Sequence, residues 1–228
     1  MNTYRFALVV GLLAASAVCP RLESAEGPGS QNGADAAQTY RYLQEVGRIR
    51  ALINADNKGR IPALLHEQDP AALEDQVSKI EGYKQDLSKV AADGVDAEAL
   101  QFSQNFGAIL DAYGSVCADA AELYRKAIKA DASGPQSSGL MLAIRGALPA
   151  VQADTLGAVA SLATAIDQLG DSAKAHAGFL GPIVQKLRDD RERLVTAKEV
   201  HHNYTLKVKS DFEQRYPSND WAARDVLP

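Results

Sequence analysis

The sequence Glu199-Val-His201-His202 is the one stretch whose residue types and spacing suggest a metal site. Glu199 and His202 stand three residues apart, so a helix presents both on one face, as the di-iron helical bundles do. Such a centre needs a second Glu-x-x-His pair and two further carboxylates. The residues three positions before His66 and His176 are both alanine. We therefore expect no di-metal centre and no resident cofactor, and Glu199, His201 and His202 remain candidates only for a single zinc or copper ion.

A second polar set, formed by Asp190, His201 and Tyr204, falls on the expected apolar face of the same helix. A buried Asp190 would need a cationic partner such as Arg145, or its pKa would rise. A drift of the helical phase that leaves Asp190 exposed is the simpler explanation. If the three residues face inward together, they are the polar groups of a small-molecule or metal pocket between two helices.

Charges of both signs fill the run from Lys186 to Arg193 on this helix. Asp189 and Arg193 have the i,i+4 spacing of a surface ion pair. The pattern predicts a solvated outer face, with a docking patch as the functional alternative.

Signatures of known catalytic and cofactor chemistry are absent from the sequence. It contains no P-loop, no glycine fingerprint for dinucleotides, no His-Glu-x-x-His and no haem-attachment motif. Its 24 basic and 29 acidic residues give a net charge of −5, without the basic stripe that nucleic-acid binding requires. We expect a protein that is neither an enzyme nor a nucleic-acid binder.

The first 25 residues have the layout of a secretory signal peptide. Arg5 precedes an uncharged apolar run, and Ala15-Ser16-Ala17 supplies small residues for cleavage after Ala17. Cleavage after Ala25 is the alternative. The apolar run is too short for a permanent membrane anchor. We expect export, to the periplasm or out of the cell.

The two cysteines are too few for a disulfide scaffold or a cysteine-based zinc site. Lipidation of Cys19 would tether the protein to a membrane surface. Ser16 and Val18 fit a lipoprotein signal poorly, so plain secretion is favoured and membrane contact is expected only if Cys19 carries lipid. Cys117 falls within an apolar helical stripe, which predicts a buried, inert thiol rather than a disulfide partner for Cys19.

Composition and periodicity predict an all-α fold. The chain is 46% hydrophobic but only 6% aromatic, and its apolar set is rich in alanine, which favours helices. Apolar residues recur at steps of three and four over residues 37–216. This predicts an up-and-down antiparallel bundle of four to five long helices, preceded by a flexible tether at 26–36 and followed by a tail at 217–228. The best stripe comprises Phe102, Phe106, Ile109, Tyr113, Val116, Ala120, Leu123 and Ala127, widened by Leu110, Cys117, Tyr124 and Ile128.

Turn and cap residues set the expected helix boundaries in the first half of the chain. The segment from Asn54 to Gly59 is rich in turn residues and predicts a helix end. Asp69 followed by Pro70, and Asp96 further on, predict two helix starts.

The second half of the chain predicts two more helices. Leu140–Leu169 forms the most apolar one, with a kink or a restart at Pro149. Gly170-Asp171-Ser172 then ends it and caps the last helix, which runs towards Tyr216 with a bend at Gly181-Pro182.

These features together predict an exported, non-enzymatic helical bundle of the cell envelope or periplasm. It would act as an interaction or structural module with an envelope or extracellular protein as its partner. The alternative is a periplasmic bundle that binds a small molecule or metal near Asp190, His201 and Tyr204. The sequence leaves the oligomeric state, the ligand and the partner open.

Overall fold

The computed structural model describes residues 30–133, 140–148, 154–169 and 178–215, which contain helices and turns but no strand. The all-α prediction is therefore confirmed. The predicted signal peptide with Cys19, and the tail after Tyr216, lie outside the described residues. The helices are α1 (Ser30–Ala55), the π-helix η1 (Asp56–Arg60), α2 (Ile61–Glu67), α3 (Pro70–Lys89), α4 (Ala97–Ser133), α5 (Leu140–Ala147), α6 (Thr155–Asp167) and α8 (Leu180–Arg215).

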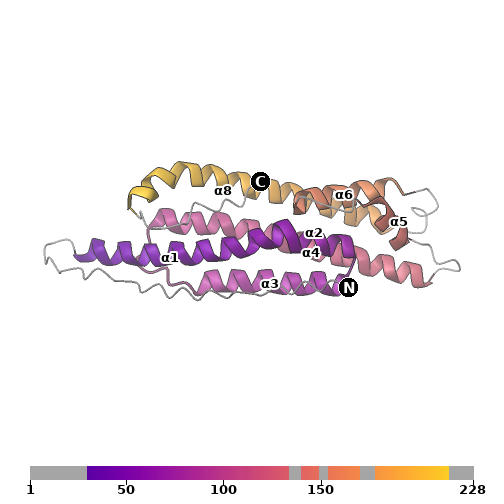
Figure 1. The fold of residues 1–228 in the computed structure, drawn as a ribbon, viewed down its shortest axis with the longest axis horizontal. Coiled ribbons are helices and arrows are strands. Elements are labelled where there is room, and N and C mark those ends of the chain that lie inside the picture. Colours follow the sequence, from indigo (N-terminus) through magenta and orange to yellow (C-terminus); the bar gives the residue numbers. More distant parts are fainter. Residues whose placement is uncertain (1–29, 134–139, 149–153, 170–177, 216–228) are drawn as a thin grey trace, which may run out of the picture. The chain divides into compact units, whose positions relative to one another are not determined.

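The four long helices α1, α3, α4 and α8 run up and down (Figure 1). Ion pairs fix the directions of α4 and α8: Lys186 near the start of α8 binds Glu122 in the second half of α4, with Nζ and Oε2 3.1 Å apart. Arg215 at the end of α8 binds Glu98 in the first turn of α4. The two helices are therefore antiparallel, as predicted.

The position of α3 follows from the same kind of contact. Lys84 on α3 binds Asp111 on α4 at 2.8 Å, and Glu74 at the other end of α3 binds Arg125. The shorter helices α5 and α6 lie at the end of the bundle where α4 finishes, and α6 packs against α8 and α2.

The apolar stripe of α4 forms the centre of the core. All eight residues of the predicted a/d pattern are buried, and so are Leu110, Cys117 and Tyr124. Ile128 is the exception, because 44% of its surface is exposed. It stands one residue after Ala127 and is turned about 100° away from it, which carries its side chain off the covered face.

The predicted helix end at Asn54–Gly59 is wrong, because the chain continues through the π-helix η1 directly into α2. The wider π-turn brings Asp56 and Asn57 into the interior. The helical run ends only at Gln68, in the left-handed conformation with φ of 61°.

Three side chains of α3 hold the Asp56 carboxylate. Lys79 Nζ donates to it at 2.9 Å, Tyr83 Oη at 3.0 Å and Gln76 Nε2 at 3.1 Å. Asn57 contacts a different helix, at Thr155 in the first turn of α6. The side-chain oxygen of Asn57 accepts from the backbone N–H of Thr155, and the backbone oxygen of Asn57 accepts from the Thr155 hydroxyl. Turn-type residues therefore act here as inward-facing hydrogen-bond partners.

The predicted cap residues are confirmed. Asp69 accepts from the backbone N–H groups of Ala71 and Ala72 at 3.0 and 3.2 Å, with Pro70 as the first residue of α3. Asp96 accepts from the N–H of Glu98 at 2.8 Å and caps α4.

Other predicted boundaries differ from the structure. The helix α1 begins at Ser30, so the second half of the expected 26–36 tether is helical. The expected helix over 140–169 is two helices, α5 and α6, which agrees with the predicted restart, and α6 has its own cap in Asp154, which accepts from the N–H of Gly157 at 2.9 Å. Pro149 lies outside the described residues.

The last helix, α8, is described from Leu180, and the expected start at Gly170-Asp171-Ser172 lies outside the described residues. Gly181 and Pro182 occupy the first turn of α8, and the segment that the expected bend would join to it lies outside the described residues. A proline is tolerated there because first-turn N–H groups have no helical acceptor.

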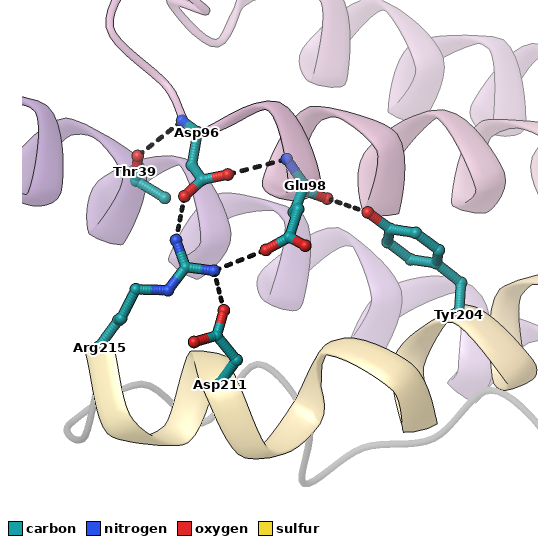
Figure 2. Close-up of polar contacts among 6 residues, drawn as sticks. All are labelled: Thr39, Asp96, Glu98, Tyr204, Asp211 and Arg215. Carbon is teal, nitrogen blue, oxygen red and sulfur yellow. Dashed lines mark hydrogen bonds and ion pairs between the residues drawn. The ribbon is translucent and has the colours of Figure 1, made fainter.

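Asp96 also joins three helices at one end of the bundle (Figure 2). Its backbone N–H donates to Thr39 Oγ1 of α1 at 2.9 Å. Its second carboxylate oxygen binds the Arg215 guanidinium of α8. Arg215 binds Glu98 and Asp211 as well, so one guanidinium contacts three carboxylates.

The two roles of Asp96 can be separated by mutation. Arg215→Met should lower the free energy of unfolding by less than about 1 kcal/mol, since partly exposed ion pairs contribute little. Asp96→Ala should lower the free energy of unfolding by about 1 kcal/mol more than Arg215→Met does, because it also removes the cap of α4. Urea unfolding followed by circular dichroism measures both, with exposed Asp93→Ala as the matched control. Equal losses in the two variants would show that the cap contributes nothing.

Candidate binding site

A groove runs between α4 and α8 and forms a cavity of about 640 Å³. We call it the α4–α8 groove. Its α8 wall extends from Asp189 to Val200, which at 1.5 Å per residue is about 16 Å, or three helical turns. The lining residues are Asn105, Ala108, Asp111 and Ala112 of α4, and Asp189, Glu192, Arg193, Thr196, Ala197 and Val200 of α8.

Small apolar side chains form the floor of the α4–α8 groove. Ala108 and Ala112 are one turn apart on α4, and Ala197 lies opposite on α8. These alanines stand beside the core stripes, so the groove is the outer seam of the α4–α8 packing. Val200 closes one end and is half exposed, at 50% of its surface.

The rim of the groove carries three carboxylates and one guanidinium. Asp111 on the α4 side binds Lys84 of α3 at 2.8 Å. Asp189 on the α8 side accepts from Gln185 Nε2 at 2.8 Å, and Glu192 is exposed. The predicted ion pair between Asp189 and Arg193 is wrong, because Arg193 Nη1 binds Asp190 Oδ1 at 3.1 Å instead.

Asp190 lies under this rim and is buried, with 4% of its surface exposed. The expected phase drift to the surface is therefore wrong. So is the expected partner, since Arg145 donates to the backbone oxygen of Glu67 at 3.1 Å. Burial and the carboxylate of Asp119 across the helix interface together raise the pKa of Asp190 to about 6, against the opposing effect of Arg193. The prediction that a buried Asp190 titrates high is confirmed.

The Asp119 carboxylate has its own cation. Lys186 Nζ lies 3.7 Å from Asp119 Oδ1 and 3.1 Å from Glu122 Oε2. The carboxylates of Asp119 and Asp190 thus meet between two cations, Lys186 and Arg193, which lie two turns apart on α8.

His201 is completely buried and packs against aromatic rings, as its place on the inner stripe predicts. Its ring centroid lies 4.7 Å from that of Phe102 and 5.8 Å from that of Phe106. His202 is half-buried, and Glu199 is exposed. The described residues contain no group of three or more His, Cys, Asp or Glu side chains placed to hold a metal ion.

The structure puts Asp190, His201 and Tyr204 into three separate contacts. Tyr204 is half-buried, and its hydroxyl donates to the backbone oxygen of Glu98 at 3.1 Å. None of the three lines the α4–α8 groove. A second cavity of about 290 Å³ lies between α6 and the first turns of α8, and none of them lines it either.

Sequence reasoning missed two buried cations, Arg50 on α1 and Lys198 on α8, each with 1% of its surface exposed. The Arg50 guanidinium lies 5.1 Å from the ring centroid of Phe102, which in turn packs on His201. Lys198 is one turn before His201 on the same face of α8. Each cation stands at a three- or four-residue step from buried apolar residues of its own helix, α1 for Arg50 and α8 for Lys198. The spacing alone therefore already indicated that both are buried.

Cys117 is buried in the α4 stripe, as predicted. Burial, with a smaller effect of the nearby Asp56 carboxylate, raises the pKa of its thiol to about 12. The thiol is therefore protonated and unreactive at neutral pH.

No protein-family model matches this chain, and comparison with curated proteins and with solved structures found no significant match. Among the described residues, no helix is both long and apolar enough to cross a bilayer.

The raised pKa of Asp190 makes the stability of the fold depend on pH. The folded state binds the Asp190 proton more tightly than an ordinary carboxyl group with a pKa of 3.8 does. The proton therefore adds to the free energy of unfolding in full below about pH 4, and this added stability is lost as the pH rises through about 6. Asp190→Asn should remove this loss and be at least as stable as the wild type at neutral pH. Thermal unfolding across that pH range measures it, with exposed Asp189→Asn as the control. Parallel pH profiles for wild type and Asp190→Asn would contradict the assignment.

Proposed function

We propose that this chain is an exported, non-enzymatic helical bundle that acts as an interaction module of the cell envelope or periplasm. The observation that carries the proposal is the α4–α8 groove, which combines an apolar floor with a charged rim. Export is supported by the signal-like layout of the first 25 residues. Asp189, Glu192 and Arg193, at the end of the mixed-charge run from Lys186 to Arg193, belong to the rim, which favours the interpretation of this run as a docking patch.

The openness of the groove favours a protein segment over a drug-sized molecule. Small-molecule sites bury most of the surface of their ligand. Here Ala108, Asp189, Glu192 and Arg193 are all exposed, so a small ligand on the alanine floor would stay in contact with water. A partner protein brings its own surface to cover the rim and exclude water around the floor.

Crosslinking in the source cells tests the docking function. A photo-crosslinking amino acid at Thr196, in the groove, should give one discrete adduct whose mass identifies the partner. The same amino acid at exposed Ser210, further along α8, should not. Ala108→Trp fills the groove and should abolish the Thr196 adduct while leaving the circular dichroism spectrum unchanged. Equal adducts from both positions, or an adduct that survives Ala108→Trp, would contradict docking in the groove.

The intact mass of the protein from the source cells tests export. It should show loss of the residues up to Ala17 or Ala25, and a cytoplasmic protein of full mass would contradict export.

Ligand binding inside the bundle is a second candidate function, favoured by the burial of Arg50, Lys198 and His201 around Phe102. Charged groups in a core cost several kcal/mol each before compensation, so two cations, Arg50 and Lys198, beside a buried histidine are unusual for packing alone. The cationic character of the set favours an anionic small molecule.

A thermal-shift panel of anionic metabolites, inorganic anions, zinc and copper tests this second function. A ligand of the core should raise the melting temperature of the wild type, and His201→Ala should lose that shift. His202→Ala is the matched control, because the half-buried neighbour points elsewhere. No shift across the panel, or the same shift in His201→Ala, would exclude binding at this layer.

A further inference from the structure

We infer that the α4–α8 groove takes a basic amphipathic helix of the partner, lying lengthwise with small apolar side chains on the alanine floor and lysine or arginine on its flanks. The inference rests on the proposed docking function and adds the chemistry of the partner.

The dimensions of the groove match a helix. The walls are two antiparallel helices, and the α8 wall is about 16 Å long, so about three turns of a third helix fit along it. Such a helix would present residues at i, i+3 or i+4, and i+7 to the floor.

The floor admits a close approach. Ala108, Ala112 and Ala197 extend little beyond the backbones of their helices, which lets a third backbone come near. Val200, half exposed at the end of the floor, is the apolar side chain that gains most from being covered.

The rim selects a positive charge. Asp111 stands on the α4 side, and Asp189 and Glu192 stand on the α8 side. The single rim cation, Arg193, is already neutralised by the buried carboxylate of Asp190 beneath it. A helix with cations meets the carboxylates of Asp189 and Glu192 on the α8 side, while Lys84 already pairs with Asp111 on the α4 side. An acidic helix or an anionic membrane surface would be repelled.

A synthetic peptide of about 21 residues, with alanine and leucine on one helical face and lysine elsewhere, is the probe. Fluorescence anisotropy with the mature wild-type protein should show saturable binding. The double variant Asp189→Lys with Glu192→Lys should weaken binding by about tenfold or more, because two attractive charges become repulsive. Glu199→Lys makes the same kind of charge change on the same helix outside the groove and should stay within about twofold of the wild type.

Two further measurements separate groove binding from general charge attraction. A scrambled peptide of the same composition has no apolar face and should bind much more weakly, and a version with glutamate in place of lysine should not bind. Ala108→Trp should abolish binding by filling the floor. Equal binding of the scrambled peptide, or equal weakening by Glu199→Lys, would overturn the inference.

The outcomes also distinguish this inference from the proposed function. If Thr196 crosslinks to a partner but the lysine peptide does not bind, the docking function stands and the basic-helix inference is overturned. If the protein alone forms a dimer that Ala108→Trp dissociates, a second copy of this chain occupies the groove and the inference is equally overturned. If neither probe engages the groove, both proposals fail.

Discussion

The burial of α4 along its length is the constraint on which the rest of the described bundle depends. Its apolar stripe is too wide for one neighbour to cover, so α3 and α8 pack on either side and α1 contributes side chains to the same core. The antiparallel directions of the neighbours follow from the turns and loops that join them. The α4–α8 groove is a consequence of this packing, because small residues border the stripes on both helices where they meet.

Polar groups inside the bundle specify how the helices are aligned, whereas the apolar stripe alone would tolerate sliding. Asp56 receives three donors from successive turns of α3, which fixes η1, where α1 ends, against that helix. Asn57, the next residue, fixes the start of α6 in the same way. Each of these contacts leaves a buried group without its partner if the helices shift by a turn, and that penalty opposes the shift.

Asp190 connects the interior to the surface of the proposed docking site. Its burial would be unfavourable as a charge, and the Arg193 guanidinium that compensates it belongs to the groove rim. The charge that a partner meets at the rim therefore depends on Asp190, which neutralises Arg193 although it does not itself line the groove. This coupling explains why the mixed-charge face of α8 can present a net acidic surface, with Asp189 and Glu192 left to interact outward while Lys84 pairs with Asp111 of α4.

The sequence by itself determined the all-α fold, the buried stripe of α4, the inert Cys117 and the caps Asp69 and Asp96. Each depends on residues within a few turns of one another, where helical spacing and cap chemistry act directly. Only the tertiary structure decided that Asn54–Gly59 continues as a π-helix, that Asp190 is buried beside Asp119 and Arg193, and that Arg50 and Lys198 belong to the core. The side chains that donate to Asp56, and so hold this turn-type residue in the interior, come from α3, 20 to 27 residues further along the chain. The groove likewise forms between two helices that are distant in sequence. Local pattern cannot supply such partners, because their proximity exists only after the helices have packed.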